Sequence, residues 1–296
     1  MMKQKHSGAA LASAPVRRFA NIMVTPTLVI MLIMTAYPLI FTLVYSFTDY
    51  NILSRDTNFI ALKNYTDLLQ NTYFRQSIWN TVKFTFLSVV FEMLCGFAMA
   101  LFVNSIHKGQ KTLRTLLLLP YLLPAVTVAL SWRMMLSPNY GIVNQVLTTL
   151  NLPVYNWFYD IQTAFGMLVL IDVWQNAPFV FLLLYAALQS VPQSQYEAAR
   201  IDGANRFQTM IYVTIPNIKN SLALCALLRT IDSFRLFEKV NLLTGGGPAN
   251  STSTITQYLY NFGISNFKFG FGSAGAIIMT VLVLILSSFY IRRALK

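Results

Sequence analysis

Long apolar runs separated by short polar segments dominate the pattern of this 296-residue sequence. A helix needs about 20 mostly apolar residues to cross a bilayer, and six runs reach about that length. They extend approximately from Ile22 to Phe47, Ile78 to Val103, Leu113 to Met135, Thr163 to Leu188, Ser221 to Leu243 and Phe271 to Ile291. The first run exceeds the apolar core of a signal peptide, which has about 7 to 15 residues. The pattern therefore predicts an all-α polytopic membrane protein with six transmembrane helices.

The fifth run is the least apolar, because five charged residues interrupt it. They are Arg229, Asp232, Arg235, Glu238 and Lys239. Each charge at the centre of a bilayer costs roughly 2.5 to 3.5 kcal/mol. We therefore expect these side chains to pair with other charges or to face a polar cavity.

Composition agrees with a membrane protein. Hydrophobic residues make up 55% of the chain and charged residues only 11%, whereas a soluble domain has about 25% charged residues. In a membrane protein, the net charge of +12 then indicates how the chain is oriented in the membrane, and it does not indicate nucleic-acid binding. Cys95 and Cys225 both lie in apolar runs, and His6 and His107 in polar segments. We expect no disulfide framework, no cysteine metal site and no histidine-based catalytic centre.

Basic residues in the loops predict the topology. The segment 104–111 and the end of the chain at 292–296 carry basic residues without an acid, whereas 136–162 and 244–267 contain no lysine or arginine. By the positive-inside rule the first two are cytoplasmic and the last two external. We expect both termini in the cytoplasm, a basic arm at 1–20 and one membrane domain at 21–296.

The polar segment at about 189–219 contains signals for a short helix. Ser194 and Glu197 have the spacing of a capping box. This spacing predicts a helix from about Gln195 to Gly203, where glycine permits a left-handed end. A partner protein could dock on this helix, or the helix could simply lie at the membrane surface and close the loop.

A second short helix is expected from about Arg206 to Tyr212, ending ahead of Pro216, because proline breaks a helix interior. Together the two helices would form a compact knob on the cytoplasmic face.

The same segment carries a longer motif. It consists of Glu197, Ala198 and Ala199, then Gly203 after three residues, and then Val213, Ile215 and Pro216. This pattern resembles the EAA loop of permease subunits of binding-protein-dependent ABC importers, E-A-A-x3-G-x9-I-x-L-P, with Val213 and Ile215 as small departures. The segments at 188–192 and 243–248 are similar to the sugar-importing branch, the maltose and glycerol-phosphate permeases. The resemblance covers about residues 20–293.

The resemblance implies the fold of a type I ABC importer permease in the cytoplasmic (inner) membrane of a bacterium. It implies a transport subunit for a sugar or oligosaccharide, with no catalytic residue, metal or cofactor of its own. Glu197, Ala198, Ala199 and Gly203 would couple the chain to separate P-loop ATPase subunits. These would bind ATP and Mg, since no P-loop pattern occurs in the sequence.

Further partners follow from the same resemblance. A second permease, usually a related but different chain, would form the other half of the path. An extracytoplasmic sugar-binding protein would deliver the cargo, membrane lipid would surround the helices, and no nucleic acid is expected. The glycines at 245–247 cannot extend a helix, so the chain should turn sharply there at the outer surface. The resemblance implies that this turn precedes an outer loop that contacts the sugar-binding protein, and a plain connector is the alternative.

The fourth run has a polar face. Asp172, Gln175, Asn176 and Phe179 stand at i, i+3, i+4 and i+7. Such a face either holds a sugar or packs against other helices through polar contacts. The resemblance favours the sugar, because this helix and the next hold it in maltose-type permeases.

The other charged positions allow similar alternatives. The four charges from Arg229 to Glu238 alternate in sign at every third residue, so they can pair with one another or line the outer half of a path. The resemblance places Ser233 and Glu238 at pocket positions. Arginines there would favour an acidic or phosphorylated sugar, so the charge of the cargo stays open. Glu92 in the second run either bonds to another helix or takes part in transport.

Two other classes of function compete with the permease. A membrane enzyme lacks the necessary chemistry, because the sequence offers no metal-ligand set and no Ser-His or Cys-His pair. A self-contained secondary transporter or channel subunit is the stronger alternative. Inverted repeats or paired broken helices would support it, and the sequence shows neither. A secondary carrier also works alone on an ion gradient, whereas a permease is inert without an ATPase.

Overall fold

The computed structural model describes residues 14–54, 57–106 and 108–294, and its regular elements there are helices. The helices are α1 (Ala14–Tyr45), α2 (Lys63–Gln70), α3 (Thr72–Ser105), α4 (Gln110–Leu122), α5 (Ala125–Met135), α6 (Ile142–Thr149), α7 (Ile161–Gln189), α8 (Gln193–Ile201), α9 (Arg206–Thr209), α10 (Ile215–Phe234), α11 (Glu238–Leu243), α12 (Ile255–Leu259) and α13 (Phe269–Ala294). Two π-helical turns, η1 (Met210–Thr214) and η2 (Tyr260–Ile264), follow α9 and α12. The prediction of an all-α fold is confirmed.

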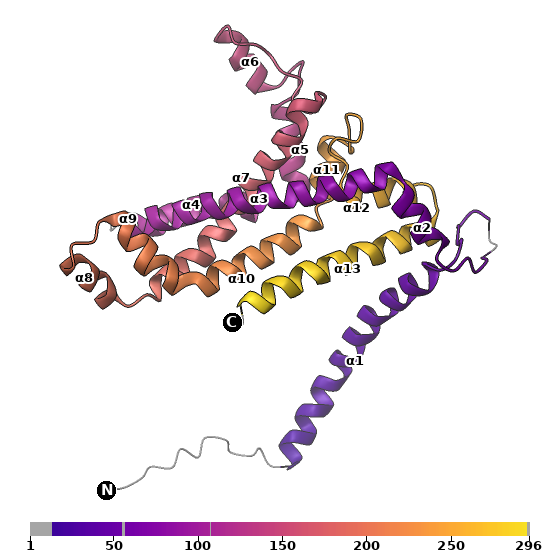
Figure 1. Cartoon of the computed structure of the whole chain (residues 1–296), viewed down its shortest axis with the longest axis horizontal. Helices are drawn as coiled ribbons and strands as arrows, with labels where there is room; N and C mark the ends of the chain where they lie inside the picture. Colours follow the sequence, from indigo (N-terminus) through magenta and orange to yellow (C-terminus); the bar gives the residue numbers. More distant parts are fainter. Residues whose placement is uncertain (1–13, 55–56, 107, 295–296) are drawn as a thin grey trace.

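Five helical segments are long and apolar enough to cross a membrane, and the bent pair α4 and α5 can supply a sixth span. α1 diverges from the bundle, and only its C-terminal end approaches α13 (Figure 1). Its apolar side chains between residues 21 and 44 are almost all exposed within this chain. Such a surface requires lipid or another apolar surface to cover it.

α3 and α7 form the central pair of the bundle and cross at Gly96. A Cβ atom on Gly96 would lie 2.5 Å from the Cβ of Val180 and 2.9 Å from the carbonyl oxygen of Ala177. Glycine therefore permits an approach of the two backbones that a larger residue would prevent. α10 packs against both helices and against α13, and α4 packs against α7.

The third predicted span is not one continuous helix. α4 and α5 meet at an angle of 89°, and the break falls at Leu123 and Pro124, where Leu123 is extended with ψ of 137°. A proline disfavours helical backbone in the residue before it, which explains the break. Pro120 also lies in the last turn of α4.

The fifth predicted span is displaced and interrupted. α10 ends at Phe234 and α11 begins at Glu238, so the expected helix from Ser221 to Leu243 is broken at 235–237. Arg229 and Asp232 therefore precede the break, Arg235 lies in it, and Glu238 and Lys239 follow it.

The expected stop ahead of Pro216 is also wrong. The chain stays helical from Arg206 to Phe234, because η1 shifts the hydrogen bonds by one residue and the N–H of Ile215 donates to the carbonyl of Met210. Pro216 then occupies the first turn of α10, where its missing N–H is tolerated.

The predicted capping box at Ser194 and Glu197 does not form. α8 begins earlier, at Gln193, after Pro192, so Ser194 already lies inside the first turn. A capping box forms instead at α9, where the side chains of Asn205 and Gln208 each accept from the other's backbone N–H, at 2.9 and 2.8 Å. Gly203 has φ of 77°, as a left-handed end of the helix requires.

Candidate functional site

The interruptions in the helices surround a polar cavity of about 450 Å³. The break between α4 and α5 borders one side and the break between α10 and α11 another, with the middle of α7 between them. The lining residues are Tyr121, Ala125, Asp172, Gln175, Asn176, Arg229, Asp232, Ser233, Arg235, Leu236, Glu238 and Lys239. Breaks expose backbone polar groups that must find partners in an apolar environment, so polar side chains gather here.

Asp172 and Lys239 form a buried ion pair in this cavity wall. The Nζ atom of Lys239 lies 2.5 Å from Oδ1 of Asp172, and the two side chains are only 3% and 2% exposed. The Nδ2 group of Asn176 donates to the same oxygen at 2.9 Å. The pair joins α11 to α7 and neutralises a lysine that could not otherwise be buried.

Gln175 connects the polar face of α7 to the break between α4 and α5. Its Nε2 group donates to the carbonyl of Leu123 at 2.8 Å, a carbonyl at the point where the helix stops. Phe179 does not line the cavity. Its ring packs against that of Tyr121, with 5.2 Å between the centroids, so Phe179 supports a ring that does line it.

Arg229 belongs to the cavity wall but is held from behind by Glu92. Its Nε and Nη2 groups donate to the two carboxylate oxygens of Glu92 at 2.7 and 3.0 Å. Arg229 also reaches Asp232 at 3.5 Å, and Asp232 accepts from Arg235 at 3.1 Å. Both sequence interpretations therefore apply: the charges pair with one another, and they also line a cavity. Glu92 bonds to another helix.

Three buried polar atoms of the cavity wall have no hydrogen-bond partner within the described residues. They are Oδ2 of Asp172, Oε1 of Gln175 and Oγ of Ser233. Unsatisfied buried polar groups are uncommon in native proteins and require an explanation. These three atoms are buried in residues that line the cavity, whereas Asp232, Arg235 and Glu238 are exposed and form its rim.

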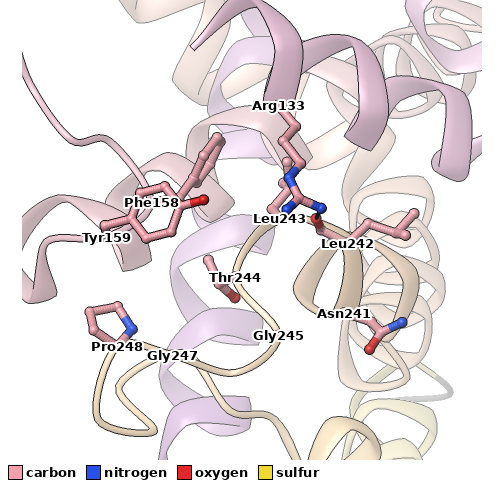
Figure 2. Close-up of a pocket in the computed structure, with 10 residues that line it drawn as sticks. All are labelled: Arg133, Phe158, Tyr159, Asn241, Leu242, Leu243, Thr244, Gly245, Gly247 and Pro248. Carbon is pink, nitrogen blue, oxygen red and sulfur yellow. Dashed lines mark hydrogen bonds between the residues drawn. The ribbon is translucent and has the colours of Figure 1, made fainter. Parts of the chain in front are cut away.

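A second, smaller pocket of about 300 Å³ lies where α5 meets the end of α11 (Figure 2). The guanidinium group of Arg133 points to the end of α11 and donates from Nη1 to the carbonyl of Leu242 at 3.0 Å. The rings of Phe158 and Tyr159 and the turn at 244–248 complete the pocket. α11 therefore has Glu238 and Lys239 in the first cavity at its start and this pocket at its end.

The motif residues at 197–203 lie at the opposite end of the molecule. α8 and α9 extend beyond the bundle there (Figure 1). Ala199 is buried, whereas Glu197, Ala198 and Gly203 are exposed. A cavity of about 1020 Å³ separates α8 and α9 from the end of α3, with Tyr196, Arg200 and Arg206 in its wall.

The structure brings together five of the six residues expected in a substrate pathway: Asp172, Gln175, Asn176, Ser233 and Glu238. Phe179 is the sixth and lies behind Tyr121. Sequence reasoning missed Tyr121, whose signal was its position between two prolines. It expected Lys239 to pair with another charge or to face a polar cavity, and Lys239 does both, but its partner Asp172 was not identified.

The comparisons with known proteins agree with this architecture. The family model of the binding-protein-dependent transport system inner membrane component matches residues 92–295. The trehalose/maltose transport system permease protein of Thermococcus litoralis is 36% identical over 275 residues, covering 93% of each chain. The sulfoquinovosyl glycerol transport system permease protein of Agrobacterium fabrum is 31% identical over 277 residues, covering 93% of this chain and 90% of that protein.

A solved structure gives the same result for the fold. A chain of a bacterial ABC transporter involved in the import of the acidic polysaccharide alginate matches with a TM-score of 0.84 and 25% identity, covering 95% of this chain and 96% of that chain. The type I importer permease fold is thereby confirmed, and with it a multi-pass subunit of the inner membrane that is not itself an enzyme. Since the family model and both relatives cover most of the sequence, this chain belongs to the inner membrane components of binding-protein-dependent transport systems.

Proposed function

We propose that this chain forms one half of the translocation path of an ATP-driven importer of sugars or oligosaccharides, with both of its termini on the cytoplasmic side. Relatives named for trehalose and maltose and for sulfoquinovosyl glycerol support sugar as the class of cargo. The observation that carries the proposal is the placement of the two sets of predicted residues. The polar face of α7 lines a cavity within the bundle, and the EAA residues lie at one end of it.

The cavity is proposed as the path of the cargo. It contains the side chains that bind sugar hydroxyls: a carboxylate at Asp172, amides at Gln175 and Asn176, a hydroxyl at Ser233 and a second carboxylate at Glu238. The Phe179 ring supports the accessible ring of Tyr121, on which a sugar face can pack. Breaks in the helices on both sides supply elements that can shift as rigid pieces during alternating access.

The segment at about 189–219 is proposed as the coupling element to a separate ATPase. Glu197, Ala198 and Gly203 are exposed on a short helix and its left-handed end, while Ala199 packs inward and fixes the helix. A helix with this exposure can fit into a cleft of a cytoplasmic ATPase subunit. That subunit binds ATP and Mg, and its closure moves the coupling helix and with it α10, which continues from α9 through η1.

Three kinds of partner complete the proposed transporter. ATPase subunits bind at the coupling segment, and a second permease supplies the other wall of the path. An extracytoplasmic binding protein docks on the outer side, where the pocket between α5 and α11 opens. A solved alginate transporter in complex with a periplasmic protein has the same fold, which supports the third partner.

The first test concerns the coupling segment. Gly203→Asp and Glu197→Lys each place a changed charge on an exposed surface, so we expect normal membrane insertion and loss of uptake. Gly109→Asp is the matched control, since Gly109 is also left-handed, with φ of 79°, and a Cβ added there would likewise have no atom within 4 Å. Normal uptake in both coupling variants would contradict the assignment.

The second test identifies the partners. The tagged chain is purified from its native membrane in mild detergent, and the associated proteins are identified by mass spectrometry and assayed for ATPase activity. We expect a P-loop ATPase and a second permease, and loss of the ATPase with Gly203→Asp. A stable preparation without ATPase that transports on an ion gradient would instead establish the secondary carrier.

A further inference from the structure

We infer that this chain's half of the path selects a cargo without negative charge, a neutral and hydroxyl-rich sugar, and that Asp232 and Glu238 determine this selectivity. The inference rests on the proposed function of the cavity and goes further, because the sequence leaves the charge of the cargo open.

Every cation in the cavity wall is already paired with an acid. Arg229 donates two hydrogen bonds to Glu92, at 2.7 and 3.0 Å, and Lys239 contacts Asp172 at 2.5 Å. Arg235 donates to Asp232 at 3.1 Å. An acidic sugar would have to share one of these cationic groups with a carboxylate that already binds it. A carboxylate in the cargo therefore meets no cation in this wall whose charge is not already balanced by an acid within the described residues.

The cavity wall has no excess of positive charge. The wall contains three cations and three carboxylates, with Glu92 as a fourth carboxylate behind Arg229. Glu238 is exposed at the rim and forms no ion pair within the part of the chain that the structure describes. A cargo with a carboxylate or phosphate would approach this unneutralised charge. A site can reject a wrong ligand by placing a like charge beside it.

The uncharged groups of the cavity favour hydroxyl donors. Oε1 of Gln175 is an acceptor, and the hydroxyl of Ser233 both an acceptor and a donor, without a hydrogen-bond partner in the part of the chain that the structure describes. These atoms are buried in this conformation, so the cargo reaches them when the break between α10 and α11 opens. Sugar hydroxyls donate to such acceptors, whereas a carboxylate cannot. The charges and the acceptors thus both disfavour a carboxylate or phosphate in the cargo.

A transporter with the same fold imports a cargo of the opposite kind, so the inference does not follow from the fold alone. The solved transporter with the TM-score of 0.84 imports an acidic polysaccharide. A shared fold does not fix the charge of the cargo, and in this chain the arginines that could favour an acid are neutralised in place. Two rim residues, Asp232 and Glu238, are exposed. Neither is the principal partner in the buried pairs of Arg229 with Glu92 and Lys239 with Asp172, and Asp232 contacts Arg229 only at 3.5 Å.

The test compares two matched pools of ligand on the complete transporter purified with its partners. One pool contains neutral di- and trisaccharides. The other contains the same sugars after oxidation of their C6 hydroxymethyl groups to carboxylates. Each pool is incubated with the transporter in the presence and absence of the binding protein, and the retained sugars are measured by mass spectrometry after rapid desalting. We expect at least about tenfold greater retention of the neutral pool by the transporter alone.

Substitutions at the rim should increase binding of the acidic sugars. Asp232→Asn releases Arg235, and Glu238→Gln removes the unneutralised charge, so both should raise retention of the oxidised pool severalfold, and the double variant further. Asp67→Asn on α2, which lies outside the cavity, removes one negative charge elsewhere and should leave the ratio unchanged.

The outcomes separate this inference from the function on which it rests. Equal or greater retention of the oxidised pool by the wild type, or a ratio unchanged by the rim variants, would overturn the inference and leave the sugar permease intact. Retention of neither pool by the wild type would overturn the sugar path itself.

Discussion

Arg229 on α10 binds Glu92 on α3 through two hydrogen bonds, although the two residues are 137 positions apart in the sequence. Both side chains are buried, with 5% and 0% exposure. The pair fixes the position of α10 relative to the central helices and hence the wall of the cavity. Removal of one partner leaves the other charge buried and unpaired.

We therefore expect Glu92→Gln to destabilise the protein strongly, by about 3 to 5 kcal/mol, as found when one partner of a buried pair is lost. Thermal unfolding of the purified transporter in detergent provides the measurement. The double variant Glu92→Gln/Arg229→Gln should recover much of the loss, because no charge is then left alone.

Arg235→Gln is the matched control for this pair, since Arg235 and Asp232 are 62% and 48% exposed. Surface pairs contribute about 1 kcal/mol or less, so this variant should unfold almost as the wild type does. Equal stability of Glu92→Gln and Arg235→Gln would show that the buried pair does not fix the bundle.

The contact of α3 with α7 at Gly96 gives a second prediction. Alanine there would place its Cβ 2.5 Å from the Cβ of Val180, so the helices must separate. We expect Gly96→Ala to destabilise by about 1 to 3 kcal/mol, as is usual for overpacking, in the same unfolding measurement. Gly166→Ala on α7 is the control, because nothing lies within 4 Å of its added Cβ, and it should have little effect.

Much of the fold could be predicted from the sequence, because the apolar runs record the requirement to cross a bilayer. α3, α7 and α13 lie where the second, fourth and sixth runs predict them. The prediction was wrong inside the third and fifth runs, where each expected helix is broken. Hydropathy is averaged over a window of residues, whereas a single Pro124 or a local cluster of charges decides whether the helix continues.

The site was predicted in part for a related reason. The polar face of α7 is readable because Asp172, Gln175 and Asn176 repeat with the period of one helix. The partners of that face are not readable in this way, since Lys239 and Tyr121 come from other helices and reach the cavity only through the breaks. Pairing between distant segments, such as Arg229 with Glu92, leaves no periodic signal in a single sequence.

The backbone at Gly203 gives a third prediction. Its φ of 77° is accessible to glycine and asparagine but strained for a β-branched residue, by roughly 1 to 3 kcal/mol. We expect Gly203→Asn to retain copurification of the ATPase and Gly203→Val to reduce it. Since no atom lies within 4 Å of an added Cβ, a clash within this chain cannot explain the difference. Equal copurification in both variants would show that the left-handed end is not required.

Asp49, just after α1, gives the last prediction, which concerns pH. Its carboxylate accepts from the backbone N–H of Asn58 at 2.6 Å and from its side-chain amide at 3.1 Å, and these bonds lower the pKa of Asp49 below its ordinary value of 3.8. The ionised form of Asp49 is thus favoured in the folded loop. Its contribution to the stability of the loop is therefore complete above the ordinary pKa and is lost as the pH falls through the lowered pKa. A carbon NMR titration of Asp49 in detergent micelles should show an inflection below 3.8.

At neutral pH, Asp49→Ala should speed hydrogen exchange at the Asn58 amide, because the carboxylate that accepts from this amide is lost. Asp67→Ala is the control and should leave this exchange unchanged. Unchanged exchange in Asp49→Ala would exclude the contact.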